Sequence, residues 1–259
     1  SAQDMRGEML AAMASMGVVV EKHHHEVASA QHELGLTFGK LVETADRMQV
    51  YKYVVQQVAQ AYGKTATFMP KPLEGVQGSG MHLHLSLFKD EQNAFYDSED
   101  PYNLSVTAKQ FMAGLLRHAA EITAVTNQNV NSYKRLVPGF EAPVHISWAR
   151  NNRSGLIRVP IAKRNSDQAT RIEYRSPDPA CNPYLAFSVI LAAGLRGIQE
   201  GYELPTEADS NLFEMGDDPE VIAAQDEYLR LAAMLWAGVD PSKAQPMKDR
   251  DIFDFLGFE

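Results

Sequence analysis

The segment Gly78-Ser-Gly-Met-His-Leu-His-Leu-Ser-Leu-Phe88 leads from a glycine-rich turn into a strict alternation of apolar and polar side chains. Successive side chains of a β-strand point to opposite faces, so the alternation predicts a strand with two unlike faces. The apolar face would carry Met81, Leu83, Leu85 and Leu87, and the polar face His82, His84 and Ser86. Glycines before the strand let the backbone approach an anionic ligand closely. The segment therefore favours a functional site over the alternative, a half-buried strand whose polar face meets only water.

The composition is that of an ordinary globular protein. The chain has 259 residues, 45% of them hydrophobic, which is enough to bury a full core. Its formal charge of −9 gives no basic surface for nucleic acid or for an anionic membrane. No apolar run approaches transmembrane length, the first residues do not resemble a signal peptide, and a single cysteine, Cys181, excludes an internal disulfide. We therefore expect a cytoplasmic protein that binds neither nucleic acid nor membrane.

A second group of ligand-type residues lies in Lys22-His-His-His-Glu26 and in Glu33, seven residues after Glu26. On a strand, His24 and Glu26 would share one face and the neighbouring histidines the other, so the three histidines would not easily bind one ion. Carboxylates suit a hard cation such as Mg²⁺ or Mn²⁺. Glu26 and Glu33 are therefore candidate metal ligands, with ordinary solvated carboxylates as the alternative.

Hydrophobic periodicity predicts a mixture of helices and strands along the chain. Apolar side chains recur at helical spacing in residues 2–16, 41–62, 105–124, 184–199 and near 219–236. Strands are expected at residues 18–21, 65–69, 145–150, 156–162 and 170–176. Between them, residues 131–144 contain Pro138-Gly139 and Pro143, which predict a loop that presents Arg135 and Glu141. A surface loop with an exposed ion pair is the alternative for that segment.

Arginine is enriched in one part of this acidic chain. Seven arginines fall within residues 135–175, in or beside predicted loops and strands. In the last of these strands, Arg171, Glu173 and Arg175 would share one face. Guanidinium groups bind phosphates and carboxylates through a planar fork that stays charged, and the carboxylate between them could hold a metal. A salt-bridged surface is the alternative.

Six of these segments closely resemble glutamine synthetase, of the bacterial type I class, and they occur in that family's order. They are HHHEV (23–27), KTATFMPKP (64–72), GSGMHLHLSL (78–87), NSYKRLVPGFEAP (131–143), NRSGLIRVP (152–160) and RIEYRSPDPACNPYLAF (171–187). The resemblance implies an α+β fold, a curved antiparallel β-sheet backed by helices, as in the catalytic domain shared by glutamine synthetases and guanido kinases. It also implies a homo-oligomer of two stacked rings with active sites between subunits.

The resemblance assigns roles to individual residues. One metal position would be formed by Glu26 and Glu33, and the other by His82 and Glu173. Glutamate would contact Gly78, Arg135, Glu141 and Arg175. ATP would contact Glu21, His84, Ser86, Arg153, Arg158 and Arg171. The catalytic residues implied are Glu26, Glu141 and Arg153, with Glu141 on a flap that closes the site.

The reaction implied is the ATP-dependent ligation of ammonia to L-glutamate, which gives glutamine through γ-glutamyl phosphate. Mg²⁺ or Mn²⁺ would be the cofactor, and ATP a co-substrate. Two alternatives remain open from the sequence. One is a γ-glutamyl ligase for another amine, such as a polyamine, and the other is a non-catalytic fragment or structural relative.

The chain also departs from the family pattern. Residues 1–259 are expected to form one catalytic domain that lacks its N-terminal part, including a β-grasp domain and a strand with a Glu-x-Glu pair that supplies a ligand to each metal. Residues 201–259 form an acidic C-terminal region that matches only weakly, and Phe213 stands where an adenylylated tyrosine would be expected. Because these carboxylates are missing, we expect the 259-residue chain alone not to make glutamine at an appreciable rate.

Overall fold

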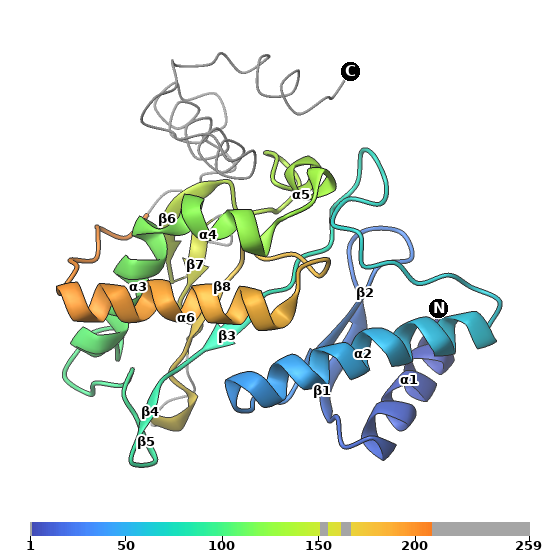
Figure 1. Ribbon diagram of the computed structural model, residues 1–259, viewed down its shortest axis with the longest axis horizontal. Coiled ribbons are helices and arrows are strands. Elements are labelled where there is room, and N and C mark those ends of the chain that lie inside the picture. Colours follow the sequence, from blue (N-terminus) through green and yellow to red (C-terminus); the bar gives the residue numbers. More distant parts are fainter. Residues whose placement is uncertain (1, 151–154, 162–166, 209–259) are drawn as a thin grey trace.

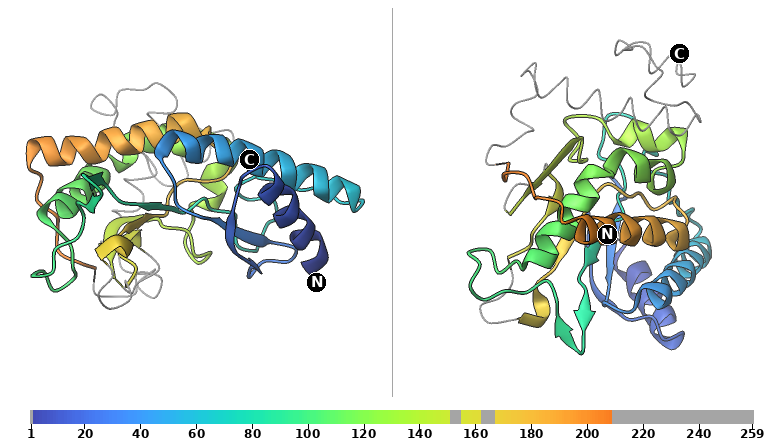
Figure 2. Two further views of the ribbon diagram at one scale, coloured as in Figure 1. Left: turned by 90° about the horizontal axis from the view of Figure 1, so that it is seen from below. Right: turned by 60° about the vertical axis from the view of Figure 1, so that its left-hand side comes forward.

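The computed structural model describes residues 2–150, 155–161 and 167–208 (Figure 1). The predicted helix near 219–236, Phe213, nearly all of the acidic C-terminal region and the ATP candidate Arg153 lie outside these ranges. Seen from below, the long helices α2 (Leu41–Ala61) and α6 (Pro183–Glu200) run along one side of the molecule, with strands beneath them (Figure 2). The described chain therefore has a helical layer over strands, and the predicted α+β class is confirmed.

The N-terminal part combines α1 (Gln3–Ser15), β1 (Val20–His25), β2 (His32–Leu36) and α2. Strands β1 and β2 form an antiparallel hairpin of their own. Apolar side chains of the predicted helix are buried: Met5, Met9 and Met13 pack with Val54 and Val58 of α2. The strand predicted at residues 18–21 thus extends through the three histidines, so that they lie on a rigid element rather than on a loop.

A four-stranded sheet occupies the centre, in the order β3 (Leu83–Leu85), β8 (Ile172–Tyr174), β7 (Gly155–Arg158), β6 (His145–Ala149). The pairs β3–β8 and β8–β7 are antiparallel, as expected. The pair β7–β6 is parallel, so this sheet is mixed. A small hairpin of β4 (Phe88–Lys89) and β5 (Gln92–Asn93) and a 3-10 turn, η1 (Asp167–Ala169), lie beyond its lower end in Figure 1.

Helices α3 (Val106–Arg117), α4 (Ala119–Thr126) and α6 cover the sheet and form the main core with it. Phe111 and Leu115 of α3 pack with Leu156, Ile172 and Tyr174 of the sheet, all fully buried or nearly so. Ser105 caps α3 by accepting a hydrogen bond from the Ala108 N–H, at the residue where the predicted helix begins. The single helix predicted for 105–124 is divided at His118, although its buried face continues from one half to the next.

Two segments differ from the sequence predictions. Residues 65–69 form no strand, because their backbone does not pair with another strand; the proline-rich run after them carries the chain toward Gly78 instead. Arg135 is not in a loop but is the last residue of a short helix, α5 (Val130–Arg135). The side chain of Arg135 is buried. The predicted loop begins only after that helix, and Glu141 lies in it with a left-handed φ of 61°.

Glycines allow α3 and α6 to approach closely. A Cβ at Gly197 would lie 2.1 Å from the Gln110 carbonyl oxygen and 2.7 Å from the Gly114 nitrogen. We expect Gly197→Ala to destabilise the fold by about 1–3 kcal/mol despite its higher helix propensity, because the backbone atoms it meets cannot move aside. The matched control is Gly7→Ala in α1, where nothing lies within 4 Å. It should stabilise by roughly 0.5–1 kcal/mol in urea unfolding, and equal effects of the two variants would contradict the packing argument.

Candidate active site

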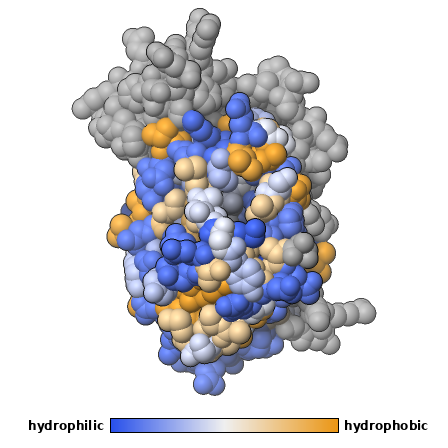
Figure 3. All heavy atoms as spheres, turned by 90° about the vertical axis from the view of Figure 1, so that its right-hand side faces the viewer, coloured by the Kyte–Doolittle hydropathy of each residue, from blue (hydrophilic) through white to orange (hydrophobic). Residues whose placement is uncertain are grey.

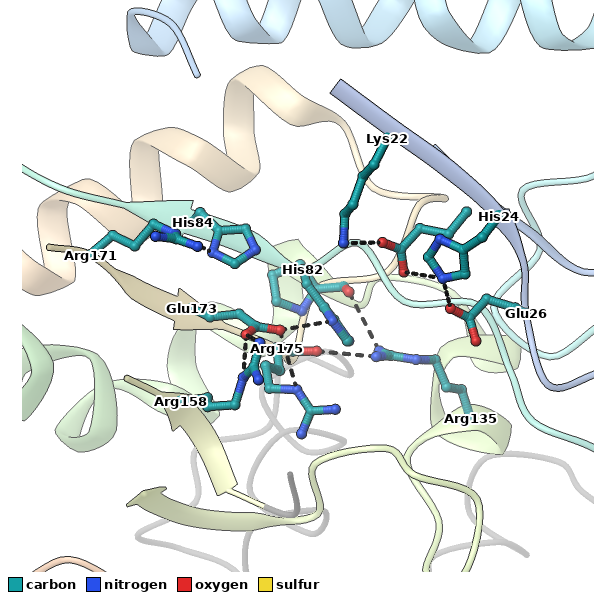
Figure 4. A network of polar contacts seen from close by, with 12 residues as sticks. Lys22, His24, Glu26, His82, His84, Arg135, Arg158, Arg171, Glu173 and Arg175 are labelled. Atoms are coloured by element: carbon teal, nitrogen blue, oxygen red, sulfur yellow. Dashed lines mark hydrogen bonds and ion pairs between the residues drawn. The ribbon is translucent and has the colours of Figure 1, made fainter. Parts of the chain in front are cut away.

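The carboxylate of Glu173 is the centre of a charged cluster on the polar face of the sheet (Figure 4). In the register of the sheet, Glu173 lies between His84 of β3 and Arg158 of β7. Its Oε1 is 3.1 Å from His82 Nδ1 and 3.6 Å from Arg175 Nε, and its Oε2 accepts a hydrogen bond from Arg158 Nε at 2.5 Å. The alternation predicted for both strands is confirmed, since it brings these groups to one face.

Burial and nearby donors act in opposite directions on this cluster. Burial alone would raise the pKa of Glu173, but the hydrogen bond from His82, the charge of His82 and that of Arg158 outweigh it and bring the pKa to about 2. Burial lowers the pKa of His82, against the hydrogen bond to Glu173 that would raise it. Near neutral pH the cluster therefore holds an ionised carboxylate beside a neutral imidazole, which can donate through Nδ1 and keep a lone pair on Nε2.

The glycines of the turn before β3 leave room for the side chains of Arg135 and His82. A Cβ at Gly80 would lie 2.5 Å from Arg135 Nη2 and 3.0 Å from His82 Nε2, and one at Gly78 would lie 2.9 Å from Arg135 Cγ. The buried guanidinium of Arg135 donates to the carbonyl of Ser176 at 2.6 Å and to that of Arg175 at 3.1 Å. The turn, α5 and the end of β8 are thus joined at one place, beside Glu173.

A second cluster lies on the hairpin, where His24 and Glu33 are direct cross-strand partners. His24 Nε2 is 2.6 Å from Glu26 Oε1 and 4.0 Å from Glu33 Oε2, and Lys22 pairs with Glu33 at 2.9 Å (Figure 4). Burial would raise the pKa of Glu33, but the hydrogen bond and charge of Lys22, followed by the charges of His24 and His82, lower it. His82 is thus within electrostatic range of Glu33, which links the two clusters.

Gln31, in the turn of the hairpin, connects the clusters mechanically. Its amide donates to the Gly78 carbonyl at 2.8 Å and to the Ser79 hydroxyl at 3.3 Å. The hairpin is therefore held against the glycine-rich turn. The sequence motifs did not single out Gln31 or Lys22, because each gains its role only from a residue distant in the chain.

The remaining candidates are placed as follows. Arg171 donates to His84 Nδ1 at 3.2 Å, so these two predicted ATP contacts lie together. Burial is the main reason why the pKa of His84 is lowered. Glu21 on β1, Ser86 after β3 and Glu141 in its loop are exposed to solvent. The proposed contacts of these three with ligands therefore stay predictions.

The donor sets differ in how well they suit a cation. Among the described residues, one set offers three donor atoms within 4.8 Å of one another, and it consists of His24, Glu26 and Glu33. Two carboxylates and an imidazole fit a divalent ion. His82 and Glu173 supply two adjacent donors, but Arg158 and Arg175 already compensate the Glu173 charge. Glu33 is compensated in the same way by Lys22, so the hairpin set differs from the Glu173 pair in offering three donors instead of two.

The low pKa of Glu173 predicts that acid weakens the fold. Its pKa is about 2 in the folded state against an ordinary value of 4.5, so its contribution to stability is present above the ordinary pKa and is lost as the pH falls toward 2. This difference in pKa corresponds to roughly 3 kcal/mol. Urea unfolding across pH 3 to 5 should show a shallower loss in Glu173→Gln than in the wild type. Parallel curves for the two proteins would refute this assignment.

Comparison with known proteins gives matches to a single enzyme family. Residues 1–240 match the family model described as "Glutamine synthetase, catalytic domain". A glutamine synthetase of Thermotoga maritima is 52% identical over 213 residues, which are 82% of this chain and 48% of that relative. One from Rhizobium meliloti is 53% identical over 215 residues, 83% of this chain and 45% of that relative. The chain therefore spans about half the length of the curated relatives it matches.

A structural comparison agrees with these matches. The Plasmodium falciparum glutamine synthetase solved by electron cryomicroscopy superposes with a TM-score of 0.78 at 34% identity, over 82% of this chain and 41% of that one. Within the described part of the chain, the helices are too short or too polar to cross a membrane.

Proposed function

Because the chain belongs to the family of glutamine synthetase catalytic domains, we propose that its protein joins ammonia to L-glutamate at the expense of ATP. The observation that carries the proposal is the Glu173 cluster near the hairpin carboxylates: acidic metal-type ligands and guanidinium groups lie close together, with His82 within electrostatic range of Glu33. That combination suits phosphoryl transfer, in which negative charge on the transferring group must be balanced. The curated relatives are glutamine synthetases, so a different amine substrate and a non-catalytic role are not favoured.

Mg²⁺ or Mn²⁺ would be held by Glu26 and Glu33 at one position and by His82 and Glu173 at the other. When bound, such ions neutralise phosphate oxygens and help to orient the transferring group. Glu21, His84, Ser86, Arg153, Arg158 and Arg171 would bind ATP. The Arg171–His84 hydrogen bond and the Arg158–Glu173 pair support this role, since they hold two guanidinium groups on the polar face of the sheet.

Glutamate would bind at the glycine-rich turn, with Gly78, Arg135, Glu141 and Arg175 as its contacts. Its γ-carboxylate oxygen would attack the γ-phosphorus of ATP and release ADP. Ammonia would then attack the carbonyl carbon of the γ-glutamyl phosphate and release phosphate. Glu26 would help to bind ammonium, and Glu141 would take the proton that the nitrogen loses. The position of Glu141 in an exposed loop supports the role of a flap residue, because an exposed loop can move over a bound substrate.

The test is formation of glutamine from glutamate, ammonia and ATP by a full-length form of the protein, measured by chromatography together with release of phosphate. Product is expected only when a divalent ion is present, with one phosphate released per glutamine. A parallel reaction with putrescine in place of ammonia tests the polyamine alternative. Phosphate release with neither product, or a preference for putrescine, would contradict the proposal.

We also propose that the protein is a cytoplasmic homo-oligomer of two stacked rings. The N-terminal part exposes several large apolar side chains, which supports burial against another chain: Met16, Val19, Val27, Phe38, Val42 and Tyr53. Figure 3, seen from the side of α1 and the hairpin, shows separate apolar patches among polar residues. A buried, free Cys181 is consistent with a reducing compartment. Sedimentation of the purified protein tests the assembly.

A further inference from the structure

Lys71 lies in the proline-rich segment that leads from α2 to the glycine-rich turn. This segment passes beside α5 (Figure 1), and the Asn131 amide of that helix pairs with both backbone groups of Lys71. The Lys71 N–H donates to Asn131 Oδ1 at 2.7 Å, and Asn131 Nδ2 donates to the Lys71 carbonyl at 3.0 Å. The neighbouring Pro70 carbonyl accepts a hydrogen bond from the Ser79 N–H at 2.7 Å. The backbone at Lys71 is therefore held between α5 and the turn proposed to bind glutamate.

The Lys71 side chain reaches the loop that carries Glu141. Its ammonium lies 3.6 Å from the centroid of the Phe140 ring and donates to the Val76 carbonyl at 2.5 Å. An ammonium within about 6 Å of a ring centroid is attracted by the negative face of the ring, and more strongly where water is partly excluded. Lys71 and Phe140 are both half-buried, whereas the next residue, Glu141, is exposed. The contact therefore fixes the loop directly before Glu141.

The backbone around Phe140 needs such a contact. Gly139 and Glu141, on either side of it, have left-handed φ angles of 80° and 61°. A non-glycine residue such as Glu141 keeps this conformation only where its surroundings impose it. The residue that follows, Ala142, is 3% exposed. The exposed carboxylate thus stands between two held residues, one fixed by the Lys71 ammonium and the other by burial.

We propose that Lys71 is a positioning residue for the reaction: its ammonium holds Phe140 and thereby sets where Glu141 stands in the flap. The inference rests on the proposed function of Glu141 and extends it to a residue to which the family resemblance assigned no role. Without this contact the loop would leave γ-glutamyl phosphate open to water. Water would attack the carbonyl carbon and give back glutamate and phosphate, so that ATP is consumed without product.

The first test measures the hold on Phe140 with no substrate present. Chymotrypsin cleaves after accessible aromatic side chains, and cleavage after Phe140 in the native full-length protein is followed by mass spectrometry. Lys71→Met keeps the length of the side chain but removes its charge, and it should raise this cleavage rate about 3- to 10-fold. Lys71→Arg should restore the wild-type rate, because a guanidinium also binds the face of a ring. Cleavage after the buried Phe111 reports global unfolding and should stay unchanged.

The second test counts the phosphate released per glutamine formed by the full-length protein. The ratio should rise from one in the wild type to about two or more in Lys71→Met, and it should stay near one in Lys71→Arg. A loss of stability alone would lower the amount of active protein without changing this ratio. Arg117→Met is the matched control, because it removes a guanidinium that lies 4.5 Å from the centroid of the Tyr202 ring on another part of the surface. It should leave both measurements unchanged.

A double-mutant cycle tests whether Lys71 acts through Phe140. Phe140→Leu removes the ring and should raise the phosphate ratio as Lys71→Met does, and the double variant should be little worse than either single one. Additive effects, unchanged cleavage after Phe140 in Lys71→Met, or a ratio that stays at one in that variant would overturn the inference. Absence of glutamine from the wild-type reaction would instead contradict the proposed function, and the cleavage rates would then decide alone whether Lys71 holds Phe140.

Discussion

In a full-length form of the protein, Glu173→Ala is expected to remove most metal-dependent ATP use and to destabilise the fold. The Glu173 side chain is only 5% exposed and faces His82, Arg158 and Arg175. Removal of one partner from a buried charged group leaves the others uncompensated, at a cost of about 3–5 kcal/mol. The same change removes a proposed metal ligand, so the phosphoryl group would lose charge stabilisation, and turnover should fall by about 100-fold or more.

The experiment measures phosphate release at limiting Mg²⁺ together with the urea midpoint of unfolding. Glu200→Ala is a matched control, since Glu200 pairs with Arg196 at 3.0 Å on the surface of α6. Such exposed pairs contribute about 0.3–0.5 kcal/mol, and this variant should keep its turnover. Wild-type rates at limiting Mg²⁺ in Glu173→Ala would rule out its assignment as a ligand.

Arg135→Ala is expected to have the next largest effect, because this buried side chain joins three segments. Its guanidinium donates to the carbonyls of Arg175 and Ser176, and its stem packs against Gly78. Hydrogen bonds from charged donors contribute about 1.5–3 kcal/mol each, so a loss of roughly 3–5 kcal/mol is expected. The glycine-rich turn would also lose its support. The glutamate concentration needed for half-maximal rate should therefore rise.

Arg135→Lys tests the geometry separately from the charge. A single ammonium lacks the planar fork that reaches carbonyls of two successive residues, so this variant should recover only part of the stability. Arg196→Ala, at the exposed side of the α6 surface pair, is the control for loss of an arginine. If Arg135→Ala unfolds at the same urea concentration as Arg196→Ala, the inference that Arg135 stabilises the fold by joining three segments is wrong.

The sequence predicted local structure well where one chemical pattern dominated. The alternation around His82 and that around Glu173 each placed polar groups on one face, and the structure confirms both faces. The helices predicted at residues 2–16 and 41–62 were also confirmed. In these cases neighbouring residues in sequence decide the outcome, because side-chain direction in helices and strands has a fixed period.

Predictions failed where a partner distant in the chain decides the conformation. Residues 65–69 have β-branched and apolar residues but find no strand to pair with. Pro138 and Gly139 indicated a loop, yet the six residues before Leu136 form a helix with Asn129 and Ser132 as a capping box. The parallel pairing of β6 and β7 could not be read from either strand, since both directions suit the same alternation.

By itself, the sequence indicated the four strands of the central sheet, the faces of His82 and Glu173, and the family to which the chain belongs. Only the tertiary structure decided the partners of these side chains. Glu173 is ionised beside two arginines, the buried Arg135 donates hydrogen bonds to backbone carbonyls after β8, and His24 lies close to Glu26 and Glu33. The physical reason is that burial and charge depend on residues brought together by folding. Spacing along the chain specifies which way a side chain points, but the protonation state and partners of that side chain depend on the groups packed around it.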